Sequence, residues 1–191
     1  PGTMGGMAPF MIANALAASL AAFVNGVDIE LIRQGLRTFV LSADQTPGRM
    51  NLFNLGTHHA LVDYAHNPAS YEAIGGFVGN WKGQRLGVIG GPGDRRDEDL
   101  MELGEIASRV FDRIIIKEDD DKRGRKSGSA ADFILKGVMQ ANANVPTEII
   151  LNETEALETA LTQVEPGGLV VIFPESVSRA IAHIQKHNPV G

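Results

Sequence analysis

The feature that most constrains the fold is an alternation, beginning near residue 50, of short apolar runs with longer stretches of helical periodicity. Each apolar run has the length of a strand, and the later stretches between them have the length of helices. Strands connected through helices need right-handed crossovers, which produce a mainly parallel sheet with helices on both faces. The expected strands are residues 50–55, 59–63, 85–89, 113–117, 147–151 and 169–173, and the expected helices are residues 69–80, 98–110, 130–140, 154–164 and 176–186.

The first two expected strands depart from the parallel pattern, because only a short turn around Gly56 separates them. So short a connection predicts an antiparallel hairpin, which we place at an edge of the sheet. The sequence therefore predicts a Rossmann-like α/β domain at residues 49–191, with a sheet of about six strands.

The residues ahead of this domain predict two helices, at 8–24 and 28–40, and then a polar link, "SADQTPGR", at 42–49. The link contains both Pro and Gly, so it is the expected domain boundary. The Ala-rich run "MIANALAASLAAFV" is shorter than the roughly 20 residues of a membrane span and lacks a basic lead-in. It therefore predicts a buried helix of a cytoplasmic protein.

Composition narrows the classes of function. The formal net charge is −6 and the isoelectric point is about 5.3, which argues against a nucleic-acid-binding protein. Cys is absent, so the chain has no disulfide and no thiolate metal site, which is neutral to favourable for a cytoplasmic location.

Three charged loops follow expected strands, on the side of the sheet where ligands bind in such folds. The first, "DYAHNP" at 63–68, puts Asp63, His66 and Asn67 at a strand end, where an acidic residue can accept hydrogen bonds from ribose hydroxyls. The same turn has a structural explanation, in which Asn67 caps the next helix and Pro68 takes its first position. The residues alone leave both explanations open.

The second loop lies within "GVIGGPGDRRDEDL" at 87–100. Its glycines permit close approach of a ligand to the backbone, and Arg95 and Arg96 can meet a phosphate or a carboxylate. No Gly-Lys-Ser/Thr follows the turn, so it is not a Walker A loop. A tight loop with solvated charges is the alternative.

The third loop, "KEDDDKRGRKSG" at 117–128, has four acidic residues followed by four basic ones. The acids from Glu118 to Asp121 can hold a cationic group, while Arg123 or Arg125 can hold an anionic one. Opposite charges side by side fit a zwitterionic substrate. A solvated run of charges is the alternative.

Two histidines, His183 and His187, stand four residues apart on the last expected helix and could share a metal ion. The sequence shows no carboxylate or Cys arranged near them, and His58 and His59 have no partner at ligand spacing. No metal site is therefore predicted.

Five segments together resemble the C-terminal part of the ATP-dependent Mur ligases, in the order and spacing of that family. They are "NALAASLAA" at 14–22, "GRM" at 48–50, "VDYAHNPASYEA" at 62–73, "VIGGPGDRRDEDL" at 88–100 and "FDRIIIKEDDD" at 111–121. The resemblance implies that residues 1–48 are the helical end of the family's central domain with its linker, and that residues 49–191 are its C-terminal domain.

The resemblance also implies a reaction, in which ATP phosphorylates a carboxylate and an incoming amine displaces the phosphate to leave an amide. Arg49 would take the catalytic role at the ATP phosphates, and Mg²⁺ would accompany ATP, with its ligands mostly outside this chain. The implied ATP-binding residues are Asn14, Arg49, Asp63, His66 and Asn67. The implied residues for the amino-acid substrate are Arg95, Asp119, Asp120, Asp121, Arg123 and Arg125.

Within the family, "GGFVGNW", "KEDDDKRGR" and "PESVSRAI" are most similar to a branch that adds arginine to the aspartate side chains of a polymer of these two amino acids. A peptidoglycan ligase is the alternative, and would be expected to carry Asn-Pro after its acid where this chain has three Asp residues at 119–121. An alternative of another class is a stand-alone nucleotide-binding module. Because no P-loop lysine is present, the chain is expected to be a fragment that is inactive alone. The full-length ligase is expected to be a homo-oligomer.

Overall fold

The structure is a computed structural model that describes residues 8 and 10–187. In these residues the chain forms seven helices and six strands. The helices are α1 (Phe10–Val24), α2 (Ile29–Thr38), α3 (Pro68–Val78), α4 (Asp97–Val110), α5 (Ser129–Asn142), α6 (Glu153–Gln163) and α7 (Val177–Lys186), and the strands are β1 (Asn51–Asn54), β2 (His59–Val62), β3 (Arg85–Ile89), β4 (Arg113–Ile116), β5 (Thr147–Ile149) and β6 (Leu169–Ile172). Every expected strand and helix is present, and the ends differ from the expected ones by at most two residues.

The strands of the described chain form one six-stranded sheet in the order β1-β2-β6-β3-β4-β5. β1 and β2 are antiparallel at one edge, with Asn51 opposite Val62, and every other neighbouring pair is parallel. The expected Rossmann-like α/β fold is therefore confirmed, including its antiparallel hairpin. The parallel strands all end on the same side, which we call the rim. The rim consists of the loops that follow these five strands and begin at Asp63, Gly90, Lys117, Ile150 and Phe173.

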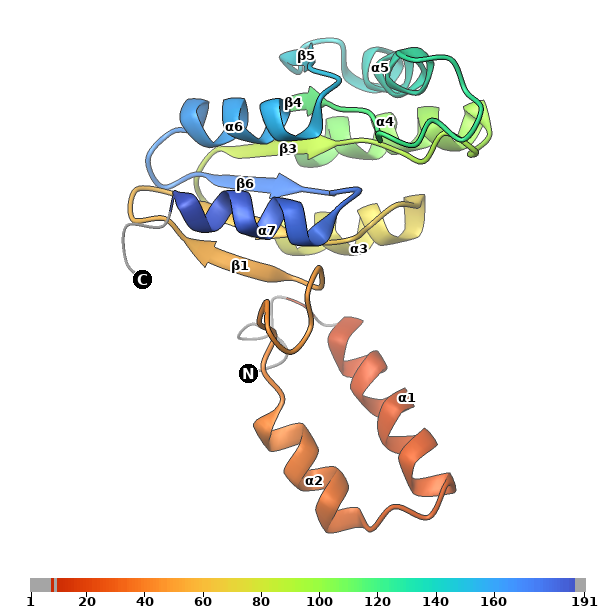
Figure 1. Ribbon diagram of the computed structural model, residues 1–191, viewed down its shortest axis with the longest axis vertical. Helices are drawn as coiled ribbons and strands as arrows, with labels where there is room; N and C mark the ends of the chain where they lie inside the picture. The colour runs from red at the N-terminus through yellow and green to blue at the C-terminus, as the bar shows by residue number, and fades with distance from the viewer. Residues whose placement is uncertain (1–7, 9, 188–191) are drawn as a thin grey trace.

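Helices cover both faces of the sheet, because each of α3 to α7 presents an apolar stripe to it. α6 and α7 lie on one face, where Leu157 and Ile184 are buried (Figure 1). α3, α4 and α5 lie on the other face, where Phe77, Leu103 and Ile134 are buried. These two apolar layers hold the rim loops in position.

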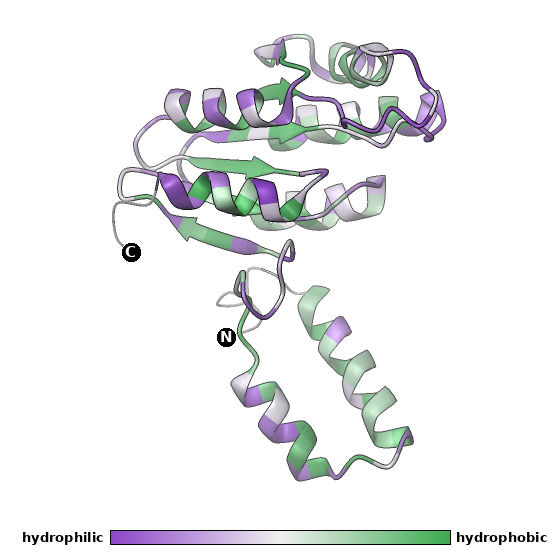
Figure 2. Ribbon diagram, in the orientation of Figure 1, coloured by the Kyte–Doolittle hydropathy of each residue, from purple (hydrophilic) through white to green (hydrophobic). Residues whose placement is uncertain are grey.

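α1 and α2 form a helical hairpin that extends away from the sheet (Figure 1). Gly26, with a φ of 81°, follows the first helix, and the Asp28 side chain accepts a hydrogen bond from the Glu30 N–H (2.8 Å) at the start of the second. The expectation that α1 is buried is wrong, because none of its residues is buried in the described chain: Phe10 and Met11 at its start pack partly against the core, but Leu16 and Phe23 are 66% and 61% exposed. Figure 2 shows α1 as a largely hydrophobic helix outside the core.

The polar link enters the sheet domain at the rim, since β1 runs antiparallel to β2 and starts there. The expected domain boundary between residues 48 and 49 stays a prediction. None of the described helices is both long and apolar enough to cross a membrane.

Candidate functional site

Two residues in a left-handed conformation bring the link onto the rim. Gly48 has a φ of 73° and Met50 a φ of 51°, which is unfavourable for a residue with a side chain. Asn51 holds this conformation: its Oδ1 accepts a hydrogen bond from the Gly48 N–H (2.6 Å), and its Nδ2 donates one to the Thr46 carbonyl (2.9 Å). The Tyr64 N–H donates to the Gly48 carbonyl (2.8 Å), so the link is fastened to the loop after β2.

Asp63, the first residue after β2, is buried against this link and is only 6% exposed. Its Oδ2 accepts a hydrogen bond from the Met50 N–H (3.0 Å). Burial raises the pKa of Asp63 above its ordinary value, although the hydrogen bond from Met50 and the charge of Arg49 act in the opposite direction. Asp63 thus fastens the link to the rim, and its contact with ribose stays a prediction.

Arg49 lies in the fastened link and is exposed. Its guanidinium carbon lies over the Tyr64 ring, 5.8 Å from the ring centroid, and the Tyr64 and His66 ring centroids are 5.3 Å apart. The His66 Nδ1 lies 3.0 Å from the Tyr64 carbonyl oxygen. We call Arg49, Tyr64 and His66 the Arg49 group; it offers a cation and flat rings side by side. Tyr64 was missed as a site residue, although the "DYAHNP" segment contains it.

The two asparagines predicted to bind ATP have different settings. Asn67 is the N-cap of α3, as its structural explanation predicts: its side chain accepts a hydrogen bond from the Ser70 N–H (3.0 Å), and Pro68 occupies the first turn. Asn14 is exposed on α1, and its Nδ2 lies 3.8 Å from the Met11 Sδ. No described hydrogen bond joins Asn14 to the rim, and an ATP contact by either asparagine stays a prediction.

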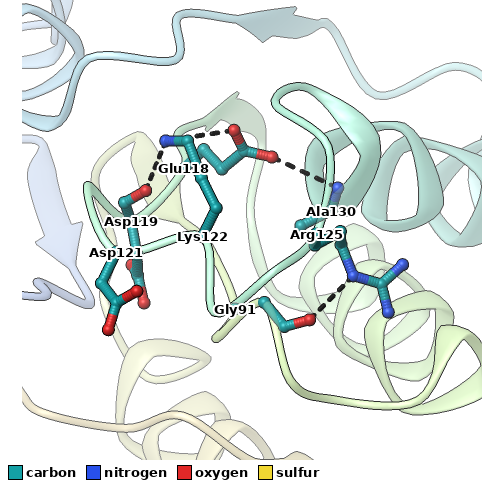
Figure 3. A pocket seen from close by; sticks show the side chains of 8 residues that line it. Gly91, Glu118, Asp119, Asp121, Lys122, Arg125 and Ala130 are labelled. Atoms are coloured by element: carbon teal, nitrogen blue, oxygen red, sulfur yellow. Dashed lines mark hydrogen bonds and ion pairs between the residues drawn. The ribbon is translucent and has the colours of Figure 1, made fainter.

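Glu118 is the first acid of the loop at residues 117–128, which we call the charged loop; it is buried, and its carboxylate points towards Lys122 and the start of α5 (Figure 3). Its carboxylate accepts hydrogen bonds from the Gly128 N–H (2.9 Å) and the Ala130 N–H (3.3 Å) at the start of α5, and the Lys122 Nζ lies 3.2 Å away. Burial alone would raise the pKa of Glu118, but these partners lower it overall. The expectation that Glu118 is available to a cationic substrate is therefore wrong, because this carboxylate caps α5.

A buried polar network starts at Lys117, which was missed from the sequence. The Lys117 Nζ lies 2.7 Å from the Asp119 Oδ1 and 2.8 Å from the Glu153 Oε2. Arg179 of α7 continues the network by pairing with Asp120 (2.8 Å) and with Glu153 (3.2 Å). Burial would raise the pKa of Glu153, but Lys117 and Arg179 lower it overall. The network joins the charged loop to α6 and α7.

Asp121 is the most accessible acid of this loop. Its side chain is 73% exposed, compared with 64% for Asp120 and 13% for Asp119. Glu175, in the loop after β6, accepts hydrogen bonds from the Asp120 N–H (2.7 Å) and the Asp121 N–H (3.1 Å) and so positions the backbone. In Figure 3 the Asp121 side chain points away from Glu118. Of the three predicted aspartates, Asp121 is best placed to meet a cationic ligand.

The three arginines predicted to bind the substrate are not equivalent. Arg125 fastens the loop between β3 and α4 at residues 90–96, which we call the Gly-rich loop: its guanidinium donates hydrogen bonds to the carbonyls of Gly93 (2.9 Å) and Arg95 (2.6 Å). Arg123 forms an ion pair with Asp94 on the surface, with 2.9 Å between its Nη1 and the Asp94 Oδ2. The Arg95 Nε is buried without a hydrogen-bond partner in the described part of the chain. Arg123, whose side chain is 44% exposed compared with 18% for Arg125, is the more accessible of these two arginines, and Arg95 keeps one unpaired donor in the described part of the chain.

A small hollow lies between the Gly-rich loop and the charged loop (Figure 3). Its lining residues are Gly91, Gly93, Glu118, Asp119, Asp121, Lys122, Arg125 and Ala130. The hollow is a shallow dent: its empty space of about 160 Å³ includes open solvent, and it encloses no room for a water molecule. A Cβ on Gly93 would collide with the Lys122 carbonyl. This glycine therefore permits close packing of the two loops, which is a different role from the predicted approach of a ligand.

The rim carries two groups of candidate residues on separate strands. The Arg49 group adjoins β2 and the acidic residues follow β4, with β6 and β3 between them. Three strand spacings amount to roughly 14 Å. The structure therefore brings the predicted residues to one end of the sheet without joining them in one pocket, an arrangement that suits two ligands lying side by side.

The prediction that no carboxylate lies near His183 and His187 is wrong. The Glu158 Oε2 lies 2.7 Å from the His183 Nε2 and 2.8 Å from the His187 Nε2. Within residues 8 and 10–187, these three residues form the one group that could hold a metal ion. Glu158 lies on α6, one helix earlier in the chain, so the sequence did not show that it meets these histidines.

Comparisons with known proteins agree with the resemblance carried by the motifs. A family profile described as "Mur ligase, glutamate ligase domain" matches residues 48–176. A cyanophycin synthetase from Synechocystis sp. is 71% identical over 191 residues, which cover 100% of this chain and 22% of that protein. The UDP-N-acetylmuramoyl-L-alanyl-D-glutamate–2,6-diaminopimelate ligase of Corynebacterium efficiens is 30% identical over 186 residues, which cover 93% of this chain and 34% of that protein.

Solved structures show the same fold. The crystal structure of the UDP-N-acetylmuramate-alanine ligase from Thermotoga maritima matches 98% of this chain and 38% of that chain, with a TM-score of 0.66 and 12% sequence identity. At this identity the match concerns the fold alone. The chain spans only about 22% of the length of the cyanophycin synthetases that it matches.

Proposed function

Since this chain belongs to the Mur ligase family and contains its glutamate ligase domain, we propose that it is part of a longer ATP-dependent ligase that forms amide bonds, which we call the parent ligase. Residues 49–191 would be the C-terminal domain of the parent ligase, and residues 1–48 the end of its central domain with the linker. The similarity to cyanophycin synthetases along the whole chain supports this assignment. In the proposal, the chain contributes to the site but does not catalyse alone.

In the proposed reaction, a substrate carboxylate oxygen attacks the γ-phosphorus of ATP, and ADP leaves. The amine of an incoming amino acid then attacks the carbon of the acyl phosphate, and phosphate leaves as the amide forms. The phosphoryl group carries negative charge during the transfer. Groups of the protein that are already in position stabilise this charge without having to rearrange. A fixed, planar guanidinium is suited to this task.

The observation that carries the proposal is the setting of Arg49. Its exposed guanidinium extends from a link whose left-handed Met50 is held by the buried Asp63. A residue in such a conformation costs roughly 1–3 kcal/mol and persists only where the surroundings hold it in place. Arg49 would therefore be presented to the ATP phosphates in a fixed position.

The rest of the nucleotide would lie along the Arg49 group. The rings of His66 and Tyr64 offer flat surfaces next to the guanidinium. The part of the Asp63 carboxylate that remains exposed would accept hydrogen bonds from the ribose hydroxyls. Asn67 is also proposed to contact the nucleotide, and Asn14 to contact adenine. Both roles rest on the family resemblance. Mg²⁺ would enter with the ATP phosphates, since it prefers phosphate oxygens and water to a complete protein cage.

The incoming amino acid is proposed to be arginine, added to an aspartate side-chain carboxylate of cyanophycin. A guanidinium is always charged and pairs best with carboxylates, and Asp121 is the exposed carboxylate of the loop. The ion pairs of Asp119 with Lys117 and of Asp120 with Arg179 would hold the loop backbone in place, so that Asp121 is kept in position. The carboxylate of the incoming arginine would meet a basic side chain of the same rim, for which Arg95 and Arg123 are the candidates; Arg123 would exchange its surface ion pair with Asp94 for this contact.

Replacement of Arg49 in the parent ligase tests the proposal. Arg49→Ala should lower kcat by roughly 100-fold or more, because removal of one group that stabilises transition-state charge has effects of this size. The KM for arginine should change much less. Arg49→Lys should recover only part of the rate, since a point charge replaces a planar fork.

The matched control is Arg109→Ala, because Arg109 forms an exposed ion pair with Glu72 at the far end of α4. Such pairs contribute little, so kcat should stay as in the wild type. Unchanged kcat in Arg49→Ala would remove the main support for the proposed catalytic role.

A further inference from the structure

Glu158, His183 and His187 converge at the end of the molecule opposite the rim. One carboxylate oxygen of Glu158 meets the Nε2 atoms of both histidines, at 2.7 and 2.8 Å. All three ligand atoms lie within 4.8 Å of one another. His187 directly follows α7, whose start adjoins the rim, so this cluster is separate from the Arg49 group and the acidic loop.

The helices explain why these side chains meet. Residues four apart on a helix lie on the same face, so His183 and His187 point the same way from α7. α6 and α7 cover the same face of the sheet (Figure 1), and Glu158 projects from α6 towards that pair. The histidine side chains are 15% and 32% exposed, so the cluster is partly shielded yet open to an ion from solvent.

The donor set indicates the kind of ion. Two imidazole nitrogens and one carboxylate oxygen form a ligand set that suits Zn²⁺, with a fourth position left for water. Mg²⁺ and Ca²⁺ prefer sites made of oxygen ligands. A neutral imidazole can bind through Nε2 while its proton lies on Nδ1, so the present hydrogen bonds can be exchanged for metal bonds.

The distances are compatible with that exchange. Zn²⁺ lies about 2.0–2.2 Å from such ligands, and a tetrahedral arrangement then separates the ligand atoms by roughly 3.3–3.5 Å. The observed contacts of 2.7 and 2.8 Å would have to open by about half an ångström. Small rotations of side chains that are not fully buried can supply this movement.

We propose that Glu158, His183 and His187 form a Zn²⁺-binding site that bridges α6 and α7. The competing explanation is a cluster of hydrogen bonds between the three side chains with no affinity for metal. The two explanations differ in whether the chain binds an added ion, so the test uses Zn²⁺ itself and needs no ligase activity.

Calorimetric titration of Zn²⁺ into the chelator-treated, tag-free chain should show one site per molecule. His183→Gln and His187→Gln should each weaken binding by at least roughly 10–100-fold, the loss seen when even a supporting residue of a metal site is removed. Glu158→Gln should also weaken it, because the amide supplies a poorer ligand. Mg²⁺ at the same concentration should not compete.

The matched control is His66→Gln, which removes a histidine at the rim and should leave Zn²⁺ affinity unchanged. Histidine side-chain NMR signals give an independent readout: among the five histidines, His183 and His187 should shift most on titration. Thermal melts of each variant without metal show whether the fold is kept. The proposal is overturned if no Zn²⁺ binds, or if His66→Gln weakens binding as much as His183→Gln.

Discussion

Asp63 and Arg49 are close neighbours at the rim but differ in accessibility. Asp63 is 6% exposed, and burial raises its pKa more than the Met50 N–H and the Arg49 charge lower it. Arg49 is exposed and lies over the Tyr64 ring. The buried acid therefore holds the link in place, and the exposed cation is left for a ligand.

Replacing Asp63 by Asn is expected to raise the free energy of unfolding at pH 7. Asn keeps an Oδ1 acceptor for the Met50 N–H but has no charge to bury. In the wild type the raised pKa means that folding favours the protonated acid, so stability falls as the pH rises through 3.8 towards the folded-state pKa. The gain from the substitution should be complete at pH 7 and should disappear below pH 3.8.

Urea unfolding of the 191-residue chain at several pH values measures this difference. Asp63→Ala is the comparison, because it also removes the acceptor and should be less stable than the wild type by about 1–3 kcal/mol. If the Asn variant were as unstable as the Ala variant at pH 7, the charge of Asp63 would stabilise the fold, and the cost of burying that charge would not dominate.

At the residue scale, the sequence predicted where side chains stand better than how they are used. Asp63 was expected at a strand end and is there, and the cap by Asn67 was one of two explanations. The burial of Asp63 depends on Met50 adopting a left-handed conformation, which its residue type does not indicate. For the same reason, the fastened link around Arg49 could not be read from the sequence.

At the scale of elements, the charged loop is held by Lys117, whose side chain is 1% exposed. Lys117 follows β4, its partner Glu153 begins α6, and Arg179 on α7 pairs with Glu153 in turn. A buried charge is tolerated only when it is paired and hydrogen-bonded. The network thus fixes the loop that carries Asp121 relative to the sheet.

Lys117→Met should destabilise the chain by about 3–5 kcal/mol, because the buried carboxylate of Glu153 and the partly buried carboxylate of Asp119 would lose their shared partner. Chemical unfolding measures the loss. Lys126→Met is the control: Lys126 is an exposed residue of the same loop, and its replacement should change stability by no more than about 0.5 kcal/mol. Equal stabilities of the two variants would show that the network does not hold the loop.

The elements themselves could be predicted from periodicity, since apolar spacing decides between a strand and a helix. The network could not, because Lys117 and Glu153 meet only once β4 and α6 are placed in the fold. Glu118 shows the same limit: its role as a cap for α5 depends on the return of the chain at Gly128. The charge run was therefore visible, but its division into paired and free acids was not.

At the scale of the whole molecule, the sheet places two candidate groups at one end of the parallel strands. The sequence predicted the parallel sheet and the edge hairpin, because connection lengths determine both. It did not predict that β6 lies between β2 and β3, since the alternation of elements does not determine strand order. That order determines the distance between the Arg49 group and the charged loop.

The helical hairpin of α1 and α2 belongs to the same scale. Its exposed apolar side chains, among them Leu16, Leu20 and Phe23, stand outside the core of the sheet domain. We interpret residues 1–48 as the end of a central domain in the parent ligase, a division that stays a proposal. In that setting the rim would be completed by groups from other parts of the ligase.

Steady-state kinetics of the parent ligase with arginine as the varied substrate test the proposed use of the rim. Asp121→Asn should raise the KM for arginine by roughly 10–100-fold, as expected when a charge-assisted hydrogen bond worth ~1.5–3 kcal/mol is lost. The KM for ATP should stay nearly unchanged, because the Arg49 group adjoins β2, which is three strands away from β4. Glu102→Gln, an exposed acid on α4, should leave both values as in the wild type. An unchanged KM for arginine in Asp121→Asn and in the Asp120→Asn, Asp121→Asn double variant would contradict the assignment of arginine as the incoming amino acid.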